Sequence, residues 1–198
     1  MEGKKYNMKV CILMGSPRPN GNTASLLKPF VSELKKYNAE IYEIDLHSKS
    51  IKPCTGCGVC QDIPDAFGCP QEDDVQYIFD AILAADIFVL ATPIYSWYCT
   101  PPMKAMLDRL VYGMNKYYGN TEKKICFWEH KKCAVITTCG YPVEKGADLF
   151  DQGMKRYCKH SKLNYVGMLA AYDEGDHVEF MDEEKEEKAR HFARQVIG

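Results

Sequence analysis

An apolar run followed by a glycine-containing polar loop and a helix pattern constrains the fold of this chain most. Val10–Met14 is uninterruptedly apolar, which is typical of a parallel strand covered on both faces. The loop 15–23 follows, and apolar residues in 27–34 then recur at helical spacing. Such a strand–loop–helix turn directs backbone N–H groups and the positive end of a helix dipole at one point, which suits an anion.

The loop 15–23 also carries groups suited to phosphate. Its glycines allow a ligand to approach the backbone closely. Its side chains offer hydroxyl and amide donors and a planar guanidinium. The candidate phosphate ligands are Ser16, Arg18, Gly21, Asn22 and Thr23. The alternative at this point is an ordinary polar loop made of turn-forming residues.

The strand–helix alternation continues along the chain and predicts a doubly wound α/β fold. Strand patterns recur at 41–46, 87–91, 133–138 and 165–171, with helices expected between them and after residue 183. Pro29 predicts a bend or a late start in the first helix, and Asp74 is expected to cap the second. Because 41–46 alternates as an edge strand does, we expect a five-stranded parallel sheet of order 2-1-3-4-5, with helices on both faces, in one domain spanning 1–198.

In such a sheet the ligand lies at the carboxyl ends of the first, third and fourth strands, where loops 15–23, 92–100 and 138–146 meet. The second loop is unusually aromatic, and its candidate ligand residues are Pro93, Ile94, Tyr95, Ser96 and Trp97. Its rings could line a flat ligand, or instead hold the loop against the core or a second subunit. The third loop contributes Thr138, Cys139, Gly140 and Tyr141. No base neighbours Cys139 in sequence, which favours a packed thiol over a reactive one.

A phosphate cradle beside an aromatic pocket describes a mononucleotide with a large ring system. FMN fits better than a dinucleotide, because a clear G-x-G-x-x-G is missing after the first strand. The flavin itself would carry the redox chemistry, so no protein acid or base is assigned to catalysis.

These motifs, together with Met103–Arg109, resemble the NAD(P)H-dependent FMN reductase family over roughly residues 8–172. The resemblance implies a flavodoxin-like fold, with the loop 15–23 on the FMN phosphate and Pro93–Trp97 and Cys139–Tyr141 around the isoalloxazine. It implies an oxidoreductase that takes a hydride from NAD(P)H and passes electrons to a quinone, a nitro or azo compound, or free flavin. It also implies homodimers or homotetramers, with 95–99 and 112–131 near the interface.

A run of cysteines suggests a metal centre. The candidate ligands are Cys54, Cys57, Cys60 and Cys69, and close thiolates before a Cys-Pro pair are typical of iron–sulfur sites. The run resembles the compact motif of iron–sulfur flavoproteins, which implies a [4Fe–4S] cluster and an electron-carrier function, although the interval before Cys69 is longer here. Zinc on the same sulfurs, a redox pair, packed thiols, and a non-catalytic thiol or zinc module are the alternatives.

Composition excludes other partners. The net charge of −2 gives no electrostatic reason to bind nucleic acid or an anionic membrane. No apolar run has the length of a membrane span, and Met1–Lys5 lacks a signal-peptide pattern, so we expect a cytoplasmic protein whose ten cysteines are free or bind metal.

Overall fold

A computed structural model describes residues 7–117, 122, 124–175 and 177–198. The N-terminal expectation for Met1–Lys5 therefore lies outside the described residues. Among the helices that are described, none combines the length and the apolar character that crossing a membrane requires.

Seven strands and six α-helices make up the described structure. The strands are β1 Lys9–Met14, β2 Glu40–Asp45, β3 Ile87–Pro93, β4 Asn115–Lys116, β5 Ile125–Cys126, β6 Lys132–Cys139 and β7 Asn164–Tyr172. The α-helices are α1 Asn22–Lys36, α2 Val75–Ala84, α3 Pro101–Met114, α4 Val143–Gly146, α5 Asp148–His160 and α6 Glu183–Ile197. Two short 3₁₀ turns, η1 Leu46–Ser48 and η2 Val59–Asp62, flank the start of the cysteine run.

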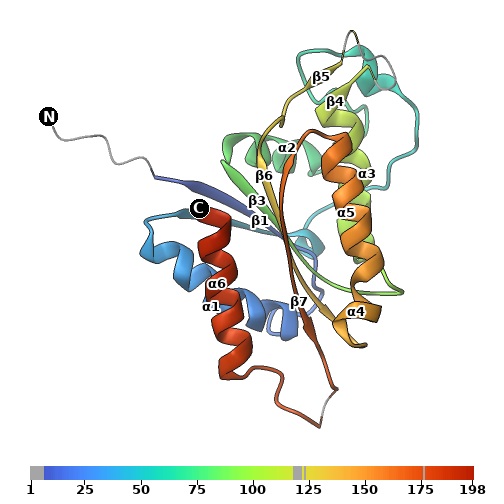
Figure 1. Cartoon of the computed structure of the whole chain (residues 1–198). Helices are drawn as coiled ribbons and strands as arrows, with labels where there is room; N and C mark the ends of the chain where they lie inside the picture. The colour runs from blue at the N-terminus through green and yellow to red at the C-terminus, as the bar shows by residue number, and fades with distance from the viewer. Residues whose placement is uncertain (1–6, 118–121, 123, 176) are drawn as a thin grey trace, which may run out of the picture.

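The main sheet has five parallel strands in the order β2-β1-β3-β6-β7, which confirms the order 2-1-3-4-5 and the doubly wound fold. Helices α1 and α6 cover one face, and α2, α3 and α5 cover the other (Figure 1). Each face has its own apolar core. The central strand β3 is buried along its whole length, as its uninterrupted apolar sequence predicts.

The starts of α1 and α2 bear on two sequence expectations. Helix α1 begins at Asn22 and runs through Pro29, because its apolar face packs in the core and outweighs the one lost hydrogen bond. Asp74 occupies the N-cap position of α2 as expected, but its side chain makes no cap hydrogen bond and instead accepts the N–H of Ser50 at 2.7 Å. The carboxylate that bonds the first turn of α2 belongs to Asp73, which accepts the Val75 N–H at 3.2 Å.

The segment 115–131, which the sequence left without an assignment, contains a small antiparallel hairpin of β4 and β5. Figure 1 shows this hairpin beyond the end of α3, beside the cysteine run. Residues 118–121 and 123 lie outside the described residues, so the interface role expected for 112–131 stays a prediction.

Candidate functional site

The carboxyl ends of β1 and β3 are joined by direct hydrogen bonds. The Gly15 N–H donates to the Ala91 carbonyl at 2.7 Å, which continues the sheet into the first loop. The hydroxyl of Thr100, at the start of α3, donates to the Gly15 carbonyl at 2.7 Å. A Cβ at position 15 would lie 3.0 Å from that hydroxyl and 3.1 Å from the Met103 side chain, so both neighbours would have to shift to admit a side chain there. Glycine at position 15 thus allows the first loop to approach α3 closely.

The first loop also contacts the third loop, which follows β6. The hydroxyl oxygens of Thr23 and Thr138 lie 2.8 Å apart and are both buried. The Ile94 N–H donates to the Thr138 carbonyl at 2.8 Å, which ties the aromatic loop to the same point. The structure thus brings the three sequence-predicted loops together at one edge of the sheet.

The N-terminus of α1 is open to a ligand. Within the described residues no side chain caps the helix, and Gly21 occupies the N-cap position. The exposed Arg18 lies against this end: a Cβ at position 21 would be 2.9 Å from Arg18 Cβ and 3.3 Å from its Nε. A helix start with unbonded N–H groups beside a guanidinium favours a phosphate.

Three of the predicted side-chain donors have partners inside the protein. The Ser16 hydroxyl accepts the Arg18 N–H at 3.2 Å and shapes the loop. The Asn22 amide donates to the Asp173 carboxylate at 2.7 Å, and Thr23 bonds Thr138. The groups left facing a ligand here are therefore the backbone N–H groups at the start of α1 and the Arg18 side chain.

The aromatic loop contains a tight turn. Tyr95 and Tyr98 exchange two backbone hydrogen bonds of 2.8 and 3.0 Å. Between them Ser96 and Trp97 adopt φ values of +49° and +63°, a conformation that costs energy for residues other than glycine. The turn leaves the Trp97 ring 48% exposed, which is unusual for so large an apolar side chain.

A pocket of about 310 Å³ lies between the second and third loops. Trp97 and Tyr141 line it and stack on each other, with ring centroids 5.9 Å apart and an interplanar angle of 13°. Gly140 also lines it, and a Cβ there would meet no atom within 4 Å. Its lining residues are Ile94, Ser96, Trp97, Cys139, Gly140, Tyr141 and Gly146. The pocket has the aromatic, concave character of a ring-binding site.

Cys139 lies at the back of this pocket and is buried. Burial raises the pKa of its thiol, although a hydrogen bond at Tyr141 opposes the shift. The side chain donates to the Tyr141 carbonyl at 3.2 Å. A protonated, hydrogen-bonded thiol is a poor nucleophile, which agrees with a packing role.

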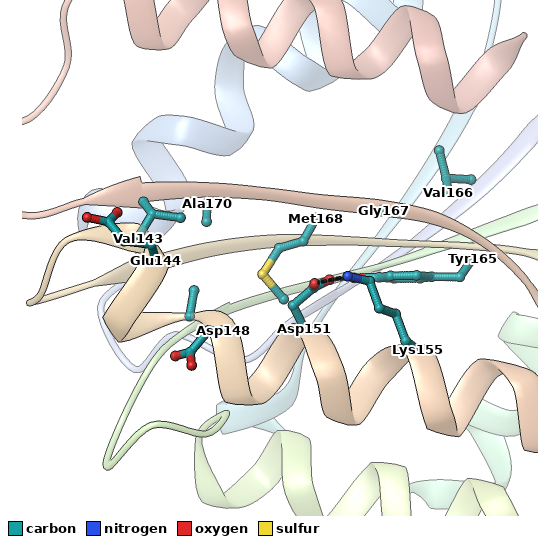
Figure 2. A pocket seen from close by; sticks show the side chains of 11 residues that line it. Val143, Glu144, Asp148, Asp151, Lys155, Tyr165, Val166, Gly167, Met168 and Ala170 are labelled. Atoms are coloured by element: carbon teal, nitrogen blue, oxygen red, sulfur yellow. Dashed lines mark hydrogen bonds and ion pairs between the residues drawn. The ribbon is translucent and has the colours of Figure 1, made fainter.

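A larger pocket, of about 550 Å³, lies between α5 and the edge strand β7 (Figure 2). Its polar groups pair with one another: Asp151 accepts from the Tyr165 hydroxyl at 2.8 Å and pairs with Lys155 at 2.5 Å. None of the predicted cofactor residues lines it. This larger pocket therefore lies apart from the cofactor site that the sequence predicts.

Some residues of the site carry no signal in the sequence. Thr100 and Asp173 make the hydrogen bonds described above, and His47 Nε2 lies 3.2 Å from the Gly15 carbonyl. Thr100 stands just before the two prolines that open α3, which marks it as a helix start but not as a partner of Gly15. Asp173 directly follows a strand that ends beside the site, and that position was the only available clue.

The cysteine run lies on an irregular segment beside the β4–β5 hairpin (Figure 1). None of its four cysteines lines the ring pocket. Cys57 is exposed, Cys60 is buried, and Cys54 and Cys69 are half-buried. In the described part of the chain, no three Cys, His, Asp or Glu side chains are gathered closely enough to hold a metal ion. The four thiols are ligands of the kind that iron–sulfur and zinc sites use, but as placed here they do not form such a site.

Fold and site together define a mononucleotide-binding domain of the flavodoxin-like class. The sequence profile of the NADPH-dependent FMN reductase family matches residues 8–151. The chain belongs to this family.

The chain is also similar to curated relatives in sequence and to solved structures in fold. An iron–sulfur flavoprotein of Archaeoglobus fulgidus is 35% identical over 107 residues, which cover 54% of this chain and 47% of that protein. One from Methanocaldococcus jannaschii is 34% identical over 102 residues, covering 52% and 51%. The chain thus matches about half the length of these curated relatives. The NAD(P)H:quinone oxidoreductase of Methanothermobacter marburgensis has the same fold, with a TM-score of 0.72, 20% identity and 98% of each chain covered.

Proposed function

We propose that this chain is an FMN-dependent oxidoreductase that takes a hydride from NAD(P)H and passes electrons to a small acceptor. The observation that carries the proposal is the meeting of an uncapped helix start, at Asn22, with a pocket lined by Trp97 and Gly140. The hydrogen bond between Thr23 and Thr138 connects these two parts. The family match supports the same cofactor.

The residues of the three loops hold and orient such a ligand. The first-turn N–H groups of α1 and the Arg18 guanidinium bind its phosphate. Trp97 and Tyr141 cover a ring face, while Gly140 leaves room for the ring edge. When bound, FMN supplies the hydride and electron chemistry. Cys139 excludes water at the back of the pocket and moves no proton.

An absorption spectrum of the protein purified without oxygen tests this function. We expect a flavin band that NADPH or NADH bleaches at a catalytic rate and that a quinone, a nitro or azo compound, or free flavin restores. Protein that stays colourless after incubation with FMN would instead support a non-catalytic thiol or zinc module. The dimer or tetramer that the family resemblance implies is a separate prediction, which light scattering of the purified protein measures.

A second candidate function is that of an iron–sulfur flavoprotein that transfers single electrons between proteins. The specific observations are the four cysteines in 54–69 and the relatives that carry this name. A [4Fe–4S] cluster exchanges one electron at a time, which suits a carrier. About four irons and four sulfides per chain support this candidate, whereas zinc or no metal contradicts it.

A further inference from the structure

The stacked rings of Trp97 and Tyr141 border the ring pocket and are open to solvent. Trp97 is 48% exposed and Tyr141 is 57% exposed, although both side chains are large and aromatic. Their ring centroids lie 5.9 Å apart, and the angle between the ring planes is 13°. Aromatic side chains left in solvent beside a pocket indicate a surface on which a ligand packs. This pair is therefore a candidate contact for a ligand other than the flavin.

The backbone fixes Trp97 in place. Tyr95 and Tyr98 close the turn around it with two hydrogen bonds, of 2.8 and 3.0 Å. Within the turn Trp97 has a φ of +63°, which a residue of this type keeps only where the surrounding structure enforces it. The Ile94 N–H donates to the Thr138 carbonyl at 2.8 Å, which anchors the loop to the sheet. Trp97 thus offers a preorganised aromatic face.

The side chain of Tyr141 is held less firmly. Its hydroxyl makes no hydrogen bond to any of the described residues, so its ring is oriented by the stack on Trp97. The residue lies between Gly140 and Pro142, in the loop that precedes α4. A stacked aromatic pair contributes about 2- to 10-fold to an equilibrium constant, which a ligand can overcome. The Tyr141 ring can therefore leave Trp97 while the turn around Trp97 stays as it is.

The stack leaves no room for a third ring between its members. Paired aromatic rings have centroids about 4.5–7 Å apart, so the 5.9 Å between Trp97 and Tyr141 is already filled by the pair itself. On this face of Trp97 a ligand ring can stack only by taking the place of Tyr141. Because Trp97 also lines the pocket proposed for the isoalloxazine, a ring in that place lies next to the flavin.

We propose that the face of Trp97 covered by Tyr141 is a subsite for the planar aromatic ring of the electron acceptor, which enters by displacing the Tyr141 ring. This rests on the proposed function, because the subsite borders the pocket assigned to FMN. An aromatic acceptor replaces one stack on Trp97 with another. A saturated molecule breaks the stack and forms none in return, so the subsite favours flat aromatic acceptors.

The test uses the full chain, loaded with FMN and kept oxidised. The probe is β-naphthol, a flat bicyclic ring without a group that the flavin reduces or a thiol adds to. Decahydro-β-naphthol is its saturated counterpart, and equilibrium dialysis measures the Kd of each. The KM for duroquinone, a fully substituted quinone that thiols do not attack, is measured with NADPH as hydride donor and connects the subsite to the acceptor.

Three variants and a matched control separate the contributions of the two rings. Tyr141→Leu removes the competing ring, Tyr141→Phe keeps that ring and removes its hydroxyl, and Trp97→Leu removes the face on which the ligand stacks. The control is Tyr37→Leu, because Tyr37 follows α1 and is 51% exposed, close to the exposure of Tyr141. The flavin absorbance of each sample confirms that it carries FMN, and a titration of each apoprotein gives its FMN affinity.

We expect Tyr141→Leu to bind β-naphthol about 2- to 10-fold more tightly than wild type, because no ring has to be displaced. The KM for duroquinone should fall by a similar factor. Tyr141→Phe and Tyr37→Leu should retain the wild-type Kd for β-naphthol. Wild type should prefer β-naphthol to its saturated counterpart by about 2- to 10-fold or more, and Trp97→Leu should lose that preference.

Three results overturn the inference. An unchanged Kd and KM in Tyr141→Leu would show that no ring is displaced, and weaker binding would show that Tyr141 packs against the ligand instead of making way for it. Tighter FMN binding in Tyr141→Leu, with an unchanged Kd for β-naphthol, would assign the exchanged place to the flavin itself. These results leave the proposed function standing, whereas a chain that binds no FMN removes the proposed function and this inference with it.

Discussion

The hydroxyl oxygens of Thr23 and Thr138 lie 2.8 Å apart, although 115 positions separate them in the chain. Thr23 belongs to the first turn of α1, where the phosphate is expected, and Thr138 ends β6 beside the ring pocket. This buried contact fixes the distance between the two halves of the proposed FMN site.

Breaking that contact should weaken FMN binding while the fold persists. Thr23→Val and Thr138→Val each keep the side-chain shape but leave the partner hydroxyl unpaired. We expect each to lose about 2- to 10-fold in FMN affinity, corresponding to one hydrogen bond of about 0.5–1.5 kcal/mol. Fluorescence titration of the apoprotein measures it. If the pair acts as a unit, the double variant loses less than the sum of the singles; strictly additive losses would show that the contact does not couple the loops.

Filling the pocket at Gly140 should exclude the flavin ring. A Cβ at this position meets no protein atom within 4 Å, so Gly140→Val is expected to fold normally. Because Gly140 lines the ring pocket, a larger side chain there should occupy part of it, and FMN affinity should fall about 10-fold or more. Circular dichroism and thermal unfolding confirm the fold in parallel. Wild-type affinity in a folded variant would place the ring elsewhere.

Cys57 should be the most reactive thiol of the cluster-free chain. Hydrogen bonds from the Val59 N–H and the Thr55 side chain lower the pKa of this exposed thiol. The buried Cys60 has a raised pKa because of burial. At pH 7 we therefore expect iodoacetamide to label Cys57 well before Cys60, and mass spectrometry of peptides resolves the order. Equal labelling of the two would contradict the described loop, and cluster loading should protect both.

The buried ion pair between Asp73 and Arg109 should dominate the acid sensitivity of the cluster-free chain. Burial alone would raise the pKa of Asp73, but hydrogen bonds from Arg109 and from the N–H groups of Lys52 and Val75 hold it below its usual value. Because the folded pKa is lowered, this stabilisation is present at neutral pH and is lost as the pH falls through the folded pKa. Asp73→Asn should lower the free energy of unfolding by about 3–5 kcal/mol at pH 7. It should also make the free energy of unfolding fall less steeply as the pH is lowered.

Denaturant unfolding across pH 2–7 measures both effects. The control is Asp108→Asn, which breaks the exposed pair with Lys104 and should change stability by no more than about 1 kcal/mol. If the two variants behave alike, the Asp73 pair contributes no more than a surface pair.

The sequence predicts the fold well because burial controls it. Uninterrupted apolar runs such as Val10–Met14 mark strands covered on both faces, and the alternation in 41–46 marks the edge. The same reasoning assigned the loops at the strand ends. It placed Asp74 at the N-cap of α2 but not the partner of its carboxylate, and it left open the start of α1, which begins at Asn22 and includes Pro29.

Long-range partners are what the sequence does not contain. Neither Thr100 nor Asp173 belongs to a motif, and each is identified only by the group it meets in space. The positive φ of Trp97 likewise has no signature, since its residue type argues against that conformation. The hydrogen bond from the Lys116 ammonium to the Cys60 carbonyl joins residues 56 positions apart, and no local sequence pattern predicts it.

Comparing FMN with riboflavin tests the central claim most directly, because the two differ only in the phosphate assigned to α1 and Arg18. Titration of the apoprotein should give FMN an affinity at least about 100-fold higher, a difference of about 2.7 kcal/mol. Arg18→Met should reduce that ratio and leave riboflavin binding unchanged. Equal affinities for the two flavins, or binding of neither, would contradict the assignment of this sheet edge to FMN.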